Sequence, residues 1–142
     1  MLIPHVVQTE ADKIFVNVYN TDVALSDGDI VVWEGTSPDG VRVTQPAANT
    51  LNLLVGACDG AIGASAYGLA QSYGYKASVL ISNDTSDTID AGDVLIPVAA
   101  ADHLKWSKTG TGLDGFFFAG QTYDTDTSAP VAALKKAFIK CM

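Results

Sequence analysis

Four aspartates occur in a phrase that the chain uses twice, and carboxylate oxygens are ligands that a hard cation binds. The phrase is Ser26-Asp27-Gly28-Asp29 in its first copy and Asp90-Ala91-Gly92-Asp93 in its second. A Ca²⁺ loop needs several oxygen ligands at fixed alternating positions, which neither copy supplies. Each copy instead precedes a short run of β-branched and aliphatic residues. Because glycine allows φ > 0 and aspartate bonds nearby backbone N–H groups, we predict two turns that lead into buried strands, and no metal site. The predicted strand-entry residues are Gly28, Asp29, Gly92 and Asp93.

The other reactive residue types do not form a catalytic motif. The only histidines, His5 and His103, have no partner at a metal-ligand spacing. Ser65 lies in Gly63-Ala64-Ser65-Ala66, where alanine replaces the last glycine of a nucleophile elbow. The glycine-rich stretch 110–115 lacks the Gly-Lys-Ser/Thr ending of a phosphate-binding loop. We therefore expect no catalytic residue, no cofactor and no enzyme activity.

The charge balance limits the partners of the chain. It has 142 residues, with 16 Asp and Glu against 8 Lys and Arg, and a net charge of −8. Binding to phosphates needs clustered Lys and Arg, so we expect no direct nucleic-acid binding. The same acidity disfavours anionic membrane surfaces. A chain of this length predicts a single β domain over residues 1–142.

The cysteines and the N-terminal residues indicate the cellular compartment in which the chain is made. Cys58 and Cys141 match no metal or redox spacing, so we favour buried thiols, with a disulfide as the alternative. The chain begins Met1-Leu2-Ile3-Pro4-His5, without a basic region followed by a long apolar run. No stretch approaches the ~20 apolar residues of a membrane span. We therefore expect synthesis in the cytoplasm and no membrane partner.

Short apolar runs bounded by turn residues predict strands along most of the chain. Pro38-Asp39-Gly40 is a turn signal that joins one such run to a returning strand. Residues 62–71 are rich in glycine and alanine, and we predict a turn followed by a strand there rather than a helix. The other expected strands cover residues 13–19, 30–33, 41–44, 51–58, 77–81, 94–97, 104–107 and 116–122.

The C-terminal segment fits two patterns. Val131, Leu134, Phe138 and Cys141 have helical spacing, whereas residues 136–141 alternate as a strand does. We favour a closing strand. Turn signals recur about every 8 to 14 residues, which is typical of a barrel or a sandwich. The predicted fold class is therefore all-β, a small β-barrel or β-sandwich.

Two aromatic clusters are candidates for contact with a partner. Phe116, Phe117 and Phe118 alternate sides on a strand, so at least one ring points away from the core unless both faces are covered. Tyr73 and Tyr75 fall on one strand face and raise the same question. Large exposed apolar surface typically marks an interface, and a strand buried on both faces is the alternative.

The order of several short segments along the chain resembles that of the decoration (cement, head-stabilising) proteins, which coat the capsids of tailed bacteriophages. The resemblance lies in the Gly-Asp strand entry at 26–33, the strand that ends Val55-Gly56-Ala57-Cys58, the stretch 69–76 around Tyr73-Gly74-Tyr75, and the second Gly-Asp strand at 91–95. It covers most of the chain from Ser26 onward. The phenylalanine triplet and the N-terminal stretch are features of this chain.

The resemblance implies a viral structural protein with a jelly-roll or tulip-like form and an extended N-terminal arm at residues 1–13. Such a protein would form a homotrimer, bind the major capsid protein on the outside of the assembled head and bridge capsomers. It would act in the virion after synthesis in the host cytoplasm. The arm, with Leu2 and Ile3, would add a strand to a neighbour's sheet edge. The alternative is a carbohydrate- or receptor-binding module of a fibre or spike, whose sugar-stacking residues would be Tyr73, Tyr75, Trp33 and Trp106.

Overall fold

The computed structural model describes residues 13–36, 39–47, 50–51, 53–82, 88–98, 101, 104–106, 117–122 and 133–141. Every regular element in these ranges is a β-strand, which confirms the all-β prediction. The strands are β1 (Ile14–Asn20), β2 (Ile30–Trp33), β3 (Arg42–Thr44), β4 (Leu54–Cys58), β5 (Tyr67–Ser82), β6 (Val94–Pro97), β7 (Leu104–Trp106), β8 (Phe117–Ala119) and β9 (Ala133–Lys140). Residues 1–12, and with them Leu2, Ile3 and nearly all of the predicted arm, lie outside the described ranges.

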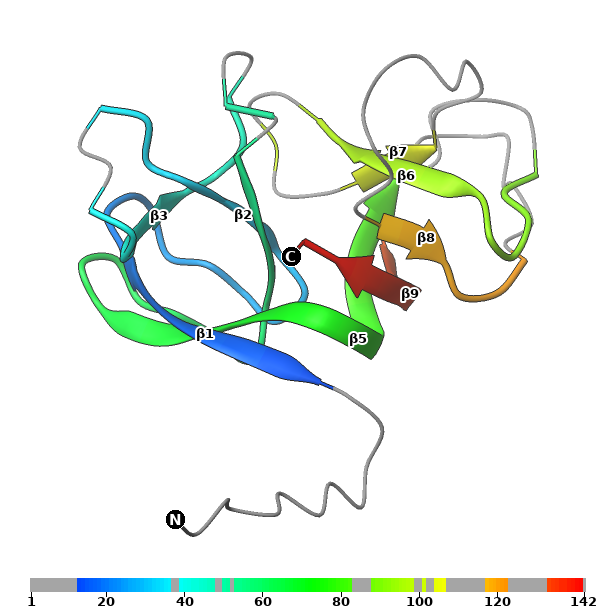
Figure 1. Cartoon of the computed structure of the whole chain (residues 1–142), viewed down its shortest axis with the longest axis horizontal. Helices are drawn as coiled ribbons and strands as arrows, with labels where there is room; N and C mark the ends of the chain where they lie inside the picture. Colours follow the sequence, from blue (N-terminus) through cyan, green and yellow to red (C-terminus); the bar gives the residue numbers. More distant parts are fainter. Residues whose placement is uncertain are drawn as a thin grey trace, which may run out of the picture.

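The strands form two closed circuits of hydrogen-bonded neighbours that share β5. The first is a closed five-stranded barrel in the order β1-β3-β2-β4-β5, which the pairing of β5 with β1 completes. The second runs β5-β7-β6-β8-β9 and is completed by the pairing of β9 with β5. In Figure 1 the first barrel is the left lobe, the second is the right lobe, and β5 runs from one to the other. Each described strand therefore has a neighbour on both sides, which is how barrels avoid open edges.

The two circuits repeat one pattern of strand pairing. β1 pairs in parallel with β3, as β5 does with β7, and all other neighbours are antiparallel. The second half of β5 thus takes the place in the second circuit that β1 has in the first, and β9 takes the place of the first half of β5. Buried residues at equivalent positions are Val18 and Val79, Leu25 and Ile89, Val31 and Leu95, Val43 and Leu104, Cys58 and Ala119, and Ala70 and Ala137.

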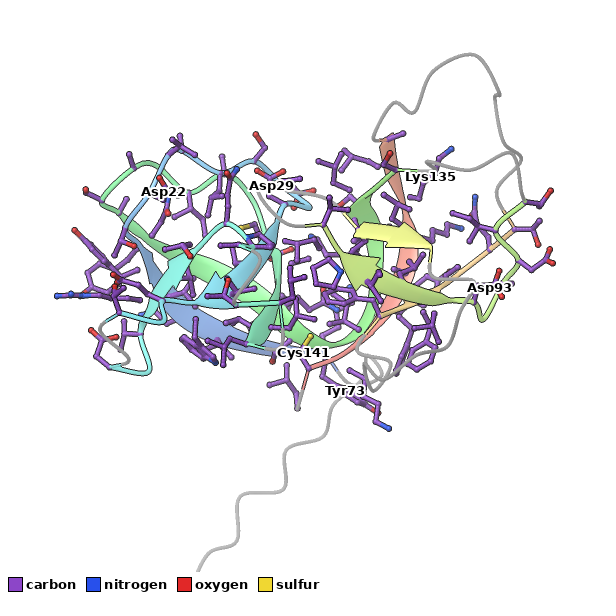
Figure 2. All side chains as sticks on the ribbon, turned by 90° about the horizontal axis from the view of Figure 1, so that it is seen from above. Asp22, Asp29, Tyr73, Asp93, Lys135 and Cys141 are labelled. Atoms are coloured by element: carbon purple, nitrogen blue, oxygen red, sulfur yellow. The ribbon has the colours of Figure 1, made fainter. Side chains whose placement is uncertain are left out.

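The repeated Gly-Asp phrase forms the same turn in each circuit, as predicted. Asp29 Oδ2 accepts a hydrogen bond from the backbone N–H of Ser26 at 2.7 Å. Asp93 Oδ2 accepts the equivalent bond from Asp90 at 2.8 Å. The two aspartates are therefore turn residues. Figure 2 shows them in different parts of the molecule.

The glycines of the two phrases attach each turn to the strand beside it. Gly28 and Gly92 have φ values of +87° and +93°, a region that side chains with a Cβ disfavour. The N–H of Gly28 donates to the carbonyl of Cys58 at 3.0 Å, and that of Gly92 donates to Ala119 at 2.7 Å. Each turn therefore joins the entry of one strand to the end of its antiparallel neighbour.

Several predicted boundaries were wrong; the strand expected over 116–122, for example, ends at Ala119. The sequence indicates separate strands before and after Tyr73-Gly74-Tyr75, but β5 is one strand of 16 residues. A glycine normally weakens a strand, yet Tyr73, Gly74 and Tyr75 all pair with β9, so the ladder continues through them. Strand β4 starts at Leu54 rather than at residue 51, because a turn bond from the Leu53 N–H to the Thr50 carbonyl holds the preceding residues.

The predicted closing strand is confirmed as β9, and the helical alternative at the C-terminus is wrong. The residues of β9 alternate in burial and pair with both β5 and β8, so tertiary pairing decides between the two patterns. The first barrel has its own core. A second core fills the other barrel and extends over Ile30, Val32 and Ala57, which face away from the first core. The two lobes are therefore packed together and not only joined by β5.

The two equivalent glycines provide a matched test of this packing. A Cβ on Gly28 would lie 2.6 Å from the Ser78 carbonyl oxygen, whereas a Cβ on Gly92 would meet nothing within 4 Å. Both substitutions carry the strain of positive φ, about 1–2 kcal/mol, but only the first also displaces β5. We expect Gly28→Ala to lower the free energy of unfolding by about 3 kcal/mol or more and Gly92→Ala by about 1 kcal/mol, measured by urea denaturation. Equal losses would contradict the close contact at Gly28.

Candidate interaction surface

The structure separates Phe117 from the tyrosine pair, whereas Phe118 lies opposite Phe138 in the ladder between β8 and β9, on the same face as Tyr75. Phe117 is fully buried in the core of the second barrel, and Phe118 is half-buried. Phe116 lies outside the described residues. Phe117 therefore serves the core and not a surface, because its strand lies between β6 and β9 with this ring pointing inward.

The tyrosine pair lies on a surface. Side chains of β5 at odd positions from Tyr67 to Tyr75 face away from the first core, whereas Ala70 and its even-numbered neighbours face inward. Tyr75 is 42% exposed, and Tyr73 makes an edge-to-face contact with Phe138 at a ring-centroid distance of 5.4 Å. Figure 2 shows Tyr73 at the margin of the molecule.

Two phenylalanines extend this surface. Phe138 lies opposite Tyr75 in the ladder between β9 and β5. Phe15 lies opposite Gln71 in the ladder between β1 and β5, on the outer face, and is 41% exposed. We call Phe15, Tyr73, Tyr75 and Phe138 the central aromatic patch. It lies where the two barrels meet, because β1 and β9 both reach Tyr73.

The border of the central aromatic patch carries positive charge. Lys136 and Lys140 are exposed and alternate with Phe138 on the outer face of β9. The chain as a whole has a net charge of −8, so this border differs in sign from the average surface. An apolar centre with a charged rim is typical of protein–protein interfaces.

No protein-family model matches the chain, and no curated protein matches its sequence. Within the described ranges, no helix has the length and hydropathy needed to cross a membrane. The same ranges hold no group of three or more His, Cys, Asp or Glu side chains placed to bind a metal ion.

A buried lysine forms the main polar cluster between the barrels. Lys76 is 5% exposed, and its Nζ lies 2.9 Å from Asp27 Oδ1 and 3.0 Å from Asp59 Oδ1. Asp27 also accepts bonds from the hydroxyl of Ser78 at 2.6 Å and from the N–H of Gly60 at 2.9 Å. The cluster ties the first Gly-Asp turn and the end of β4 to the middle of β5.

This environment changes the acidity of Asp27. Burial alone raises its pKa, but the hydrogen bonds from Gly60 and Ser78 and the contact with Lys76 outweigh burial and hold the pKa below its usual value. The folded state therefore binds a proton on Asp27 less readily than the unfolded chain does. The stabilisation is present above the unfolded pKa and is lost as the pH falls through the folded pKa.

Both cysteines are free thiols. Burial raises the pKa of Cys58 and of Cys141 to about 12, so neither is a thiolate near neutral pH. The prediction of free thiols is confirmed and the alternative of a disulfide between them is wrong, but only Cys58 is buried, while Cys141 is partly buried.

Sequence reasoning found part of this surface. It identified Tyr73 and Tyr75 but not Phe15 or Phe138, although both phenylalanines lie in alternating segments that predict strands. Lys76 gave no sequence signal, because an isolated lysine in a polar stretch normally faces solvent. Of the aromatic residues expected to stack on sugars, Trp33 packs against the first core, and the side chain of Trp106 lies outside the described set.

The ionic cluster predicts a pH-dependent stability. We expect Lys76→Met to lower the free energy of unfolding by about 1–3 kcal/mol at about pH 7, because Asp27 and Asp59 lose a charged donor. The difference from the parent chain should narrow as the pH falls from about 5 to about 2, where Asp27 becomes protonated. Urea denaturation across this pH range measures the free energy of unfolding of both chains.

Asp22→Asn, at an exposed aspartate, is the control. A difference between Lys76→Met and the parent chain that does not change with pH would contradict the role assigned to the ionic cluster.

Proposed function

We propose that this chain is a structural protein of a tailed-phage virion that binds the outside of the assembled capsid and stabilises it by bridging capsomers. The observation that supports this best is the central aromatic patch, an exposed apolar surface on a rigid two-barrel frame. The order of the strand-entry phrases supports it independently through the family resemblance. Binding that favours the assembled shell over its separated subunits stabilises the shell by mass action and requires no catalytic group.

The central aromatic patch suits a protein partner. Aromatic residues give large contact area and are enriched among the residues that dominate binding energy. The lysines at its border favour a partner whose apolar site has an acidic rim. The major capsid protein is the partner that the resemblance implies, with the capsid surface as the location.

The N-terminal arm and the homotrimer remain predictions. Addition of an arm strand to a neighbour requires an open sheet edge. Each described strand has two neighbours, but β1 pairs with β3 only at Tyr19 and Asn20, so the ladder on that side covers only the end of β1. The carbohydrate- or receptor-binding module of a fibre or spike remains the alternative function.

Binding to heads tests the proposal. The chain is mixed with heads of the encoding phage that lack this protein, and co-sedimentation gives the affinity. We expect Phe15→Ser and Tyr75→Ser each to weaken binding at least tenfold, because each removes aromatic contact from the centre of the patch. Tyr67→Ser is the matched control, since Tyr67 is also exposed but lies roughly 26 Å along β5 from Tyr75. Absence of binding by the parent chain would overturn the proposal.

Light scattering tests the homotrimer separately. The resemblance implies a stable trimer at micromolar concentration, and burial of an apolar surface between copies would supply its stability. A molar mass of three chains is the expected result. A single-chain mass at that concentration would exclude the trimer without excluding binding to the capsid.

A further inference from the structure

A second surface feature lies at the far end of the first barrel, away from the central aromatic patch. It is a hollow of about 380 Å³, within the range of roughly 300–1,000 Å³ that small-molecule sites occupy. Its lining residues are Tyr19, Asp39, Val41, Arg42 and Tyr67. Three separate parts of the chain therefore meet there, namely β1, the segment leading into β3, and the start of β5.

Strand pairing fixes the walls of the hollow. Tyr19 pairs with Tyr67 across the β1–β5 ladder and with Arg42 across the parallel β1–β3 ladder. The N–H of Tyr19 also donates to the Val41 carbonyl at 2.8 Å. Because Tyr19 is held on both sides by backbone bonds, the site is formed by the barrel itself and needs no rearrangement to exist.

Two aromatic rings form the apolar side. The rings of Tyr19 and Tyr67 have centroids 4.9 Å apart and planes inclined at 58°. Tyr19 is half-buried and supports the ring of Tyr67, which is 67% exposed. A supported but exposed ring presents a flat apolar face, with a hydroxyl at its edge, to a ligand that is itself apolar on one face.

An ion pair forms the polar side. Arg42 is the only arginine of the chain, and its Nε lies 3.2 Å from Asp39 Oδ2. Asp39 Oδ1 accepts bonds from the N–H groups of Arg42 and Val41 at 2.8 and 2.9 Å. These two backbone bonds, together with the charge of Arg42, hold the pKa of Asp39 below its usual value, so the pair is doubly charged and neutral in sum.

This arrangement selects for an uncharged ligand rich in hydroxyl groups. An anion would be repelled by Asp39 and a cation by Arg42, so neither sign is favoured. The guanidinium is a planar fork of five N–H donors, and the carboxylate is an acceptor. Adjacent hydroxyls can therefore receive from Arg42 and donate to Asp39, while the C–H face of the same ring packs on Tyr67.

We propose that this hollow binds a neutral saccharide unit, whose apolar face packs on Tyr67 and whose adjacent hydroxyls bond to Arg42 and Asp39. The proposal is independent of capsid binding, because the hollow and the central aromatic patch are separated along β5. It gives the chain a second ligand in addition to the partner that holds it.

The test is a titration of the ¹⁵N-labelled chain with maltotriose, cellotriose, chitotriose and mannotriose, followed by amide chemical shifts. We expect at least one trisaccharide at millimolar concentration to shift the amides of Tyr19, Val41, Arg42 and Tyr67.

Variants of the lining residues test the assigned contacts. Tyr67→Ala should abolish the amide shifts, and Tyr67→Phe, which keeps the ring, should retain them. Arg42→Lys keeps the charge but loses the planar fork, so it should weaken binding at least tenfold. Tyr75→Ala, at an exposed tyrosine of the central aromatic patch, is the matched control and should leave the saccharide-induced shifts unchanged.

Four results would overturn the proposal. The first is that no trisaccharide shifts these amides although the parent chain is folded. The second is that a proline-rich peptide shifts them and no saccharide does, since such peptides also dock on aromatic grooves. The third is that Tyr75→Ala removes the response, which would place binding on the central aromatic patch. Retention of the response by Tyr67→Ala would equally contradict the assigned stacking.

Discussion

Strand β5 is the element on which both barrels depend. Its first half pairs with β1 and β4, and its second half pairs with β7 and β9, so the hydrogen bonds that close each circuit end on the same strand. The ionic cluster of Lys76 then connects the middle of β5 to the first Gly-Asp turn. Because neither circuit can close without β5, the conformation of this strand sets the position of every surface residue discussed above.

The strand also explains the location of the candidate surfaces. The central aromatic patch lies at the point where β1 and β9 both approach Tyr73, and the saccharide hollow lies at the start of β5. Strand residues supply all of the central aromatic patch and three of the residues that line the hollow, Tyr19, Arg42 and Tyr67. A protein that works by contact benefits from such a frame, since less conformational freedom is lost on binding.

Local sequence signals predicted much of the fold but not its closure. The Gly-Asp turns, most strands and the final strand follow from turn residues and alternation, which act over a few residues. Pairing of β5 with four other strands acts across the whole chain, and no local pattern records it.

Gly74 illustrates the difference, because a glycine between two tyrosines indicates a break, while pairing with β9 keeps the strand continuous. The repeat was visible in the sequence only at its turns, since most equivalent positions elsewhere share burial but differ in residue type, as Cys58 and Ala119 do. The same limit applies to the surfaces: the alternation around Tyr73 indicated an exposed face, but only the ladder registers bring Phe15 and Phe138 to it.

Native-state amide hydrogen exchange tests most directly whether one strand holds both barrels together. If it does, the amides of Ala70 and Val79, in the two halves of β5, exchange with the same free energy, and that value equals the free energy of global unfolding. Core amides of β2 and of β8 should then reach nearly the same value, because neither barrel can open alone. If the amides of one barrel exchange through a low-energy opening while those of the other stay protected, the two circuits are independent units and β5 does not unite them.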